Sequence, residues 1–442
     1  MMLDAFIKQI PDSDRHVVIS PTSGSHKAYF AARVFSRQNS SMVVVLSHTK
    51  KALQFIDDLK FYLPDQEKQI IYFPGYHIQP FKALNYHKET STDRLAALSR
   101  ILNAGSDPFI IVTALDTVLQ KVIPKDALNQ FCELVMANED ADRDAIVEKL
   151  EAGGYVKTSL VEDPGDYSVR GGILDVFSPG EELPVRIEFF GDLVESIRTF
   201  SPFTQRGVAE VSETVIIPAT EAVVDKDEQP HILARLRQTG SQAGIDTSRI
   251  REYVNQVREM GRFPGLESML PIVYETPDPF FDYLDPGTLL ILDDADEYPS
   301  LADDFEKRAQ ASYQTAAGDN KLCVSPENFC LDWEQLAEKI GAFRTVSFRQ
   351  LAVAGGHAEG DSEIACRFDY SDNSGLSGEL KREGAADTPL RPLVDWLEKQ
   401  QEAGRRTICV LNQEVQANRL ISLLQPYGFV PATSSSFQEF DT

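Results

Sequence analysis

The stretch His16-Val-Val-Ile-Ser20, followed by Pro21-Thr-Ser-Gly-Ser-His-Lys-Ala28, decides the fold class of this chain. Its β-branched run predicts a buried strand, and the apolar residues after it recur at helical spacing from Phe30 to Phe35. The same unit recurs downstream, where strands are predicted at 43–46, 70–73 and 109–112 and a helix from Thr92 to Gly105. Strands that alternate with helices are typical of a parallel, doubly wound α/β sheet.

A second pattern interrupts the first after Pro124. A predicted helix at 143–152 is followed, up to Pro218, by consecutive short strands separated by glycine-containing turns, which indicates a mostly antiparallel domain. The predicted units are residues 1–123 and 221–351 (two parts of one α/β domain), 124–220 (a small inserted domain), 352–388 (a linker with one short strand near Cys366) and 389–442 (a further small α/β unit with a strand at 407–411).

The composition narrows the classes of function. The 442 residues include 68 acidic and 43 basic side chains, and the formal net charge of −25 repels phosphate backbones. This argues against sequence-independent nucleic-acid binding by the whole chain. The five cysteines form no Cys-x-x-Cys pair and are too scattered for a disulfide framework. No stretch approaches the ~20 apolar residues of a membrane-spanning helix, so a cytoplasmic location is expected.

The turn after the first strand occupies the position of a phosphate-binding loop. Such a loop needs glycines whose N–H groups surround the phosphates, a lysine for their charge and a hydroxyl residue for magnesium. On that template, Pro21 and His26 replace the two glycines, Lys27 is kept, and Ala28 replaces the hydroxyl residue. Because proline has no N–H to donate and alanine cannot bind a metal ion, an ordinary strand–helix turn is expected instead of nucleotide binding.

A second nucleotide motif is altered in the same way. The apolar run 289–292 ends in Asp293 and Asp294, whereas a nucleotide-hydrolysing site has an Asp for magnesium and then a Glu that activates water. Together with the altered loop, this indicates a relic of a nucleotide site. His77 and His87 lack the short spacing of a helical metal pair. We therefore expect no catalytic residues, no metal and no cofactor.

One predicted strand combines charged and aromatic residues on one face. In Leu183-Pro-Val-Arg-Ile-Glu-Phe-Phe190, side chains alternate between the two faces of the strand. One face holds Val185, Ile187 and Phe189, and the other holds Arg186, Glu188 and Phe190. A Phe beside an Arg is typical of a binding hot spot, and Arg170 adds a second arginine before the strand at 173–177. Two interpretations stay open: Phe190 contacts a partner, or it covers an edge of its own domain.

Several segments of the sequence point to a family. They are Tyr72–Pro80, Thr90–Leu95, Ile111–Gln120, Tyr167–Phe177 and Pro184–Phe190. These segments resemble the amino-terminal, UvrB-like module of the bacterial transcription-repair coupling factor (Mfd), well over residues 1–340 and loosely beyond. This module is itself similar to the damage-verifying repair subunit UvrB. Both nucleotide motifs depart from UvrB, and a short polar connection at 81–92 replaces the long aromatic hairpin with which UvrB grips DNA.

The resemblance implies a binding module. It implies that the inserted domain docks on UvrA, with the family's binding residues at Arg170, Arg186 and Phe190. Full-length members continue into an RNA-polymerase-binding domain and a DNA translocase, so we expect an amino-terminal fragment that reaches RNA polymerase and DNA only through parts beyond residue 442. The expected function is a non-catalytic adaptor that recruits UvrA to stalled polymerase. The alternative is a nucleotide-dependent DNA-handling protein like UvrB.

Overall fold

The protein is described here from a computed structural model. The structure describes residues 16–20, 22, 24–38, 40–76, 88–105, 107–349, 364–366, 373–383, 390–411 and 413–434. Within these ranges, none of the helices combines the length and the apolar character needed to cross a membrane. Pro21, His77 and His87 lie outside the described residues, as does the segment 81–87 of the predicted polar connection.

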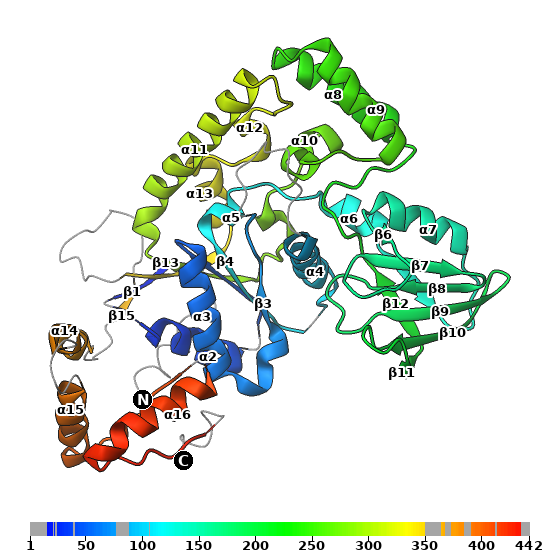
Figure 1. Ribbon diagram of the computed structural model, residues 1–442. Helices are drawn as coiled ribbons and strands as arrows, with labels where there is room; N and C mark the ends of the chain where they lie inside the picture. The colour runs from blue at the N-terminus through cyan, green and yellow to red at the C-terminus, as the bar shows by residue number, and fades with distance from the viewer. Residues whose placement is uncertain are drawn as a thin grey trace.

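A seven-stranded sheet forms the centre of the main domain (Figure 1). Every strand pairing described in it is parallel, as the alternation of strands and helices predicts. The order of its strands across the sheet is β15 (Ile364–Cys366), β1 (His16–Ile19), β14 (Arg344–Phe348), β13 (Leu289–Asp293), β2 (Met42–Leu46), β4 (Ile110–Ala114) and β3 (Ile70–Tyr72).

Helices cover both faces of this sheet. All five residues of β2 are buried: Val43 and Val45 belong to one apolar core, and the alternate residues Met42, Val44 and Leu46 belong to another. Because both faces of the sheet are buried, the sequences of its strands are continuous apolar runs. One core contains α2 (His26–Gln38) and α3 (Thr49–Tyr62). The other contains α4 (Lys88–Asn103), α5 (Leu115–Val118), α11 (Tyr298–Gly318), α13 (Trp333–Gly341) and the short helix η3 (Phe280–Tyr283).

Helix α4 begins earlier than the sequence predicts. Thr92 was expected to open it, but the helix starts at Lys88. The hydroxyl of Thr92 donates to the carbonyl oxygens of Lys88 and Glu89, at 3.0 and 2.9 Å. Thr92 therefore bonds back to its own helix and is not a cap.

The inserted unit lies at one end of the molecule, beyond α4 (Figure 1). It contains a six-stranded sheet, a two-stranded sheet that pairs β12 with β5, and α7. Every pairing in the six-stranded sheet is antiparallel except that of β6 with β7. The elements are α6 (Lys125–Phe131), β5 (Glu133–Met136), α7 (Arg143–Ala152), β6 (Val156–Lys157), β7 (Asp166–Arg170), β8 (Ile173–Val176), β9 (Val185–Phe190), β10 (Leu193–Phe200), β11 (Gly207–Val211) and β12 (Glu213–Ile216).

A third apolar core belongs to a group of helices at the top of Figure 1. It is built mainly by α8 (Gln229–Gln242), α9 (Thr247–Met260) and α10 (Leu270–Val273), with contributions from α11 and α12 (Pro326–Phe329). The remaining short helices are η1 (Pro64–Gln69), η2 (Leu266–Met269), η4 (Ala295–Glu297) and η5 (Gln425–Tyr427).

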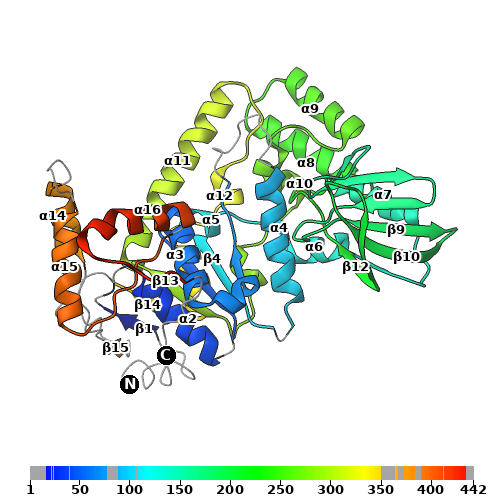
Figure 2. The ribbon, with the colours of Figure 1, turned by 60° about the horizontal axis from the view of Figure 1, so that its bottom comes forward.

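The C-terminal region differs from the prediction in two places. Residues 407–411 form no strand, and part of the predicted linker forms helix α14 (Ser374–Glu383). The short strand expected near Cys366 is confirmed: it is β15, and it extends the main sheet beside β1. The last helices are α15 (Arg391–Glu402) and α16 (Glu414–Leu424). In both ribbon views, α14 to α16 and the inserted unit lie at opposite ends of the molecule (Figure 2).

Two ionic contacts, one of them fully buried, attach the inserted unit to the main domain. Arg94 of α4 forms an ion pair with Glu221, the residue at which the chain returns from the inserted unit, and both side chains are 1% exposed. The Arg94 guanidinium also lies 4.5 Å from the centre of the Tyr76 ring, and the Tyr76 hydroxyl donates to Glu221 at 2.7 Å. Nearer the sheet, Lys88 pairs with Asp166 at 2.6 Å. The contacts of α4 with Asp166 and with Glu221 therefore fix the orientation of the inserted sheet relative to the main domain.

Candidate protein-binding surface

The outer face of the six-stranded sheet is the face that does not contact α7. The alternation predicted along β9 is confirmed: Val185 and Ile187 are buried in the core with α7, and Arg186 lies on the outer face with Phe190. Phe190 is 78% exposed, so it does not cover an edge of its own domain. Its neighbour Phe189 is partly buried against the core. The outer face thus presents an aromatic ring at the end of a charged strand.

Asp175 of β8 joins the two predicted arginines. The carboxylate of Asp175 is fully buried. Arg186 binds it through two contacts, Nε to Oδ1 at 2.7 Å and Nη2 to Oδ2 at 2.9 Å, and Arg170 Nη2 binds Oδ2 at 2.7 Å. The hydrogen bond with Asp175 also raises the pKa of the Arg186 guanidinium. Both guanidinium groups are therefore held in place at the surface before any partner arrives.

Strand order corrects one detail of the prediction. Arg170 was expected just before the strand at 173–177, but it is the last residue of a strand of its own, β7, and the strand at 173–176, β8, lies between β7 and β9. The two arginines meet because Asp175 stands directly opposite Arg186 in the β8–β9 register. Sequence reasoning missed Asp175. The available signal was an acidic residue inside the apolar run Ile173–Val176, a position that requires a charged partner.

The middle of the outer face carries mixed charge. Arg198 of β10 stands opposite Arg186 in the register and contacts Glu188 at 3.3 Å and Glu210 of β11 at 3.8 Å. The Arg186 guanidinium lies 4.8 Å from the centre of the Phe200 ring. A partner therefore meets acidic and basic groups side by side, which favours a polar protein surface over a phosphate backbone.

A glycine turn sets the spacing of β7, β8 and β9. The β7–β8 connection is Gly171-Gly172, and Gly171 has φ +59°, in the left-handed region. A Cβ at position 172 would lie 2.6 Å from the carbonyl oxygen of Phe189, and the Gly172 carbonyl accepts the Phe189 N–H at 2.7 Å. Only glycine permits this close approach, which brings Arg170 and β9 to the same region of the sheet.

Residues of the two altered nucleotide motifs form a network of charges. Lys27 of α2 forms an ion pair with Asp293 at the end of β13, and its Nζ lies 3.6 Å from Asp294. Lys51 of α3 lies 3.5 and 3.4 Å from the same two carboxylates. Although partial burial acts to lower the pKa of Lys51, the charges of Asp293 and Asp294 raise it overall. Ala28 is fully buried in the core under the sheet.

This network brings together residues that the sequence separates. The positions Lys27, Asp293 and Asp294 were predicted to share a degenerate site, and the structure places them in contact. Lys51 was missed. Its signal is positional: it follows β2, the strand beside β13, and the carboxyl ends of neighbouring parallel strands meet at one edge of a sheet. His26 is the first residue of α2.

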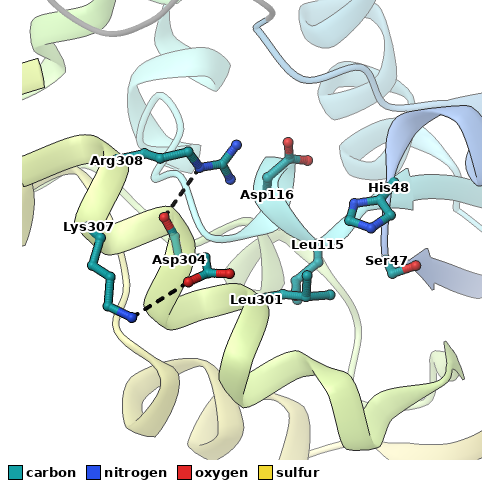
Figure 3. Close-up of a pocket in the computed structure, with 8 residues that line it drawn as sticks. All are labelled: Ser47, His48, Leu115, Asp116, Leu301, Asp304, Lys307 and Arg308. Carbon is teal, nitrogen blue, oxygen red and sulfur yellow. Dashed lines mark hydrogen bonds and ion pairs between the residues drawn. The ribbon is translucent and has the colours of Figure 1, made fainter. Parts of the chain in front are cut away.

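A pocket of about 450 Å³ opens at the same edge of the main sheet (Figure 3). It is lined by Ser47 and His48 after β2, Leu115 and Asp116 after β4, and Leu301, Asp304, Lys307 and Arg308 of α11. Lys307 pairs with Asp304 at 3.5 Å, so part of its basic lining is already neutralised. Sequence reasoning did not single out these residues, because they are distributed over three segments of ordinary composition.

The fold and the inserted unit together define a class of protein. Residues 135–221, which contain α7 and the whole six-stranded sheet, match the family described as the UvrB interaction domain. The UvrABC system protein B of Chlorobaculum tepidum is 27% identical over 312 residues, which cover 64% of this chain and 45% of that protein. The chain is thus an α/β protein whose inserted unit matches the UvrB interaction domain and whose sequence is similar to that of UvrB.

More of the chain is similar to a second group of proteins. The transcription-repair-coupling factor of Myxococcus xanthus is 28% identical over 410 residues, covering 91% of this chain and 34% of that protein. The transcription-repair-coupling factor of Escherichia coli is 24% identical over 326 residues, covering 73% of this chain and 27% of that protein. As its motifs predict, the chain resembles the amino-terminal module of the transcription-repair-coupling factor, and it spans about a third or less of the length of these relatives.

Proposed function

We propose that this chain is a non-catalytic adaptor module of transcription-coupled nucleotide excision repair. It binds UvrA through the outer face of the inserted sheet, at Arg170, Arg186 and Phe190. As part of a longer translocase, it brings UvrA to RNA polymerase stalled at damage, and contacts with polymerase and DNA belong to parts of that protein beyond residue 442.

The observation that carries this proposal is the arrangement around Asp175. Two guanidinium groups are held by one buried carboxylate, and an aromatic side chain that is 78% exposed lies on the same face. All of these residues fall inside the segment that matches the UvrB interaction domain. Arginines that are held in place before binding lose little entropy when a partner docks, and arginine and aromatic side chains are both common among hot-spot residues.

A titration of UvrA into the chain by calorimetry tests the proposal. Replacing Phe190 by Ala should weaken binding by about 1–4 kcal/mol, because the ring would fill an apolar pocket of UvrA. The melting temperature should be nearly unchanged, since the side chain makes no core contact. Arg170→Ala should weaken binding in the same range.

Phe189→Ala is the matched control, because it removes the same side chain from the next position on the strand. Phe189 packs partly against the core, so this variant should lower the melting temperature. The proposal is wrong if Phe190→Ala and Arg170→Ala both keep full UvrA affinity in folded protein.

A second candidate function, nucleotide-dependent DNA handling like that of UvrB, is favoured by the retained Lys27 and by the strand that ends in Asp293. Against it, Asp293 and Asp294 already contact the Lys27 ammonium, where the phosphates of a nucleotide would bind in a working loop. Calorimetric titration with Mg-ATP should therefore show no binding up to millimolar concentration. A micromolar dissociation constant would make this second candidate the better one.

A further inference from the structure

The loop between β10 and β11, residues 201–206, presents an aromatic side chain to solvent. Phe203 in this loop is 96% exposed, the highest value among the exposed large apolar residues of the described ranges. Single exposed apolar residues are common on protein surfaces, so exposure alone does not identify a binding site. The structure of the loop supplies the further argument.

The loop is closed by hydrogen bonds and is not a loose connection. The N–H of Ser201 donates to the carbonyl of Arg206 at 2.9 Å, and the N–H of Gln205 donates to the carbonyl of Ser201 at 2.8 Å. Gln205 has φ +58°, a left-handed conformation that costs a non-glycine residue free energy. Its side-chain amide donates to the carbonyls of Pro202 at 2.7 Å and of Val161 at 3.2 Å. The chain thus holds a strained loop in one shape, and that shape exposes Phe203.

The loop is continuous with the outer face that carries Arg186. The loop follows directly after Phe200, whose buried ring packs with Phe177 and lies under the Arg186 guanidinium. Phe190 is at the other end of the face, opposite Leu193 in the β9–β10 register. Along β10, Phe200 lies seven residues after Leu193, which corresponds to about 23 Å at 3.3 Å per residue.

This separation fits a single interface. A protein–protein interface of standard size buries about 800 Å² on each partner, which corresponds to a patch about 30 Å across. Phe190 and Phe203 would lie toward opposite sides of such a patch, with the charged groups of Arg186, Glu188 and Arg198 between them. Both aromatic residues fall within the segment that matches the UvrB interaction domain.

We propose that Phe203 is a second aromatic anchor of the UvrA-docking surface, and that it inserts into an apolar pocket of UvrA at the end of the interface away from Phe190. This inference rests on the proposed function, because it names a further contact to the same partner. A loop whose backbone is already held by hydrogen bonds loses little conformational freedom on docking, which favours binding through its exposed aromatic residue.

The test compares UvrA affinities of folded variants by calorimetric titration. Phe203→Ala should weaken binding about tenfold or more, as expected for a buried aromatic anchor, and leave the melting temperature unchanged. Val415→Ala is the control: Val415 is 76% exposed on α16, outside the inserted unit, and its removal should leave UvrA affinity unchanged. Because the length of β10, about 23 Å from Leu193 to Phe200, separates the two aromatic sites, the effects of Phe190→Ala and Phe203→Ala should multiply in the double variant.

The possible results separate the two proposals. If Phe190→Ala weakens binding and Phe203→Ala does not, the second anchor is refuted and the adaptor function stands. If the unmodified chain shows no affinity for UvrA, both proposals fail. If Phe203→Ala weakens UvrA binding and also lowers the melting temperature, the proposed anchor is refuted, because Phe203 would then be stabilising its own loop.

Discussion

Asp175 lies in an environment of the candidate binding surface that is unfavourable for a charge. It is a fully buried carboxylate whose charge is compensated by two arginines that are themselves partly exposed, with 25% of the Arg186 side chain and 50% of the Arg170 side chain accessible. Exposed arginines can return to water when the carboxylate is removed, but a carboxylate without arginines cannot. Asp175 therefore fixes the positions of the two guanidinium groups. The arginines compensate the charge of Asp175, and their remaining N–H donors stay exposed.

Replacing Asp175 by Asn should lower the free energy of unfolding of the inserted unit by about 1–3 kcal/mol, since charge-assisted hydrogen bonds become neutral ones. UvrA affinity should fall as well, because both guanidinium groups lose their fixed position. Calorimetric unfolding and UvrA titration measure the two effects. Glu210→Gln, which removes an exposed partner of Arg198 at 3.8 Å, should change stability by no more than about 0.5 kcal/mol. Equal effects of the two variants would contradict this account.

Asp58 on α3 gives the chain a pH dependence of stability. Burial, with a smaller effect from Asp57, raises the pKa of Asp58 to about 6. A carboxyl whose pKa is higher in the folded state than in the unfolded state binds more protons when folded. The contribution of Asp58 to the free energy of unfolding is therefore fully present below about pH 4, and it is lost as the pH rises through about 6.

Asp58→Asn should raise the free energy of unfolding at pH 7.5 by about 1 kcal/mol, discounted for the partial exposure of the side chain, and by almost nothing at pH 4. Melting temperatures of the variant and the unmodified chain at both pH values check this. A constant difference across the range would show that Asp58 titrates normally. Lys50→Gln, at an exposed position of the same helix, provides a charge-change control.

At the scale of elements, the attachment of the inserted unit depends on α4. The Arg94–Glu221 pair connects this helix to the segment that follows β12, and both side chains are 1% exposed. Glu221 also accepts the Ile123 N–H at 3.2 Å, on the chain that leads into the inserted unit. The two chain crossings of the junction therefore meet at one buried carboxylate. This arrangement fixes the orientation of the outer face of the inserted sheet relative to the main sheet.

Arg94→Met should lower the free energy of unfolding by about 3–5 kcal/mol, because it leaves Glu221 buried without its cationic partner. The double variant Arg94→Met/Glu221→Gln should recover part of that loss, since no uncompensated charge remains. A double-mutant cycle on calorimetric unfolding, together with limited proteolysis at the junction, measures the coupling. Additive losses would show that the two side chains do not depend on each other.

Elements with strong local patterns could be predicted from the sequence. The β-branched runs of β1, β2 and β4 and the alternation along β9 locate their strands and their faces correctly, because each pattern lies within one segment. The strand at 407–411 was wrongly predicted from an apolar run of the same kind. In the structure, residues 405–411 are largely exposed and form no strand. An apolar run forms a strand only where a neighbouring strand can pair with it, and composition alone does not show whether one is present.

Contacts between distant segments could not be predicted in the same way. Lys27 and Asp293 are 266 positions apart, and the pairing of Asp175 with both arginines depends on which strands are neighbours. Period-two alternation states which residues share a face, but it does not give the order of strands in a sheet. The UvrA-binding residues came from the family resemblance together with this alternation, and their role remains a prediction.

At the scale of the whole molecule, charge opposes nucleic-acid binding. The net charge of −25 acts on any phosphate backbone that approaches, and the arginines of the outer face are paired with Asp175, Glu188 and Glu210. Fluorescence anisotropy with duplex DNA at physiological salt should give a dissociation constant at or above about 10⁻⁴ M, the weak end of non-specific binding. Sub-micromolar binding that weakens steeply with salt would contradict this expectation.

The order of strands in the main sheet also has a consequence for how the chain is made. β1 lies between β14 and β15, and its partner across from His16 is Thr345, 329 positions later. At a synthesis rate of about 5–20 residues per second, roughly 15–65 s pass on the ribosome before β1 has a neighbour. During that interval β2, β3 and β4 can pair with one another, and the inserted unit, whose strands pair among themselves, can fold completely. The outer face of the inserted sheet can thus form while β1 is still unpaired, and an apolar segment that is exposed for this long is prone to aggregate.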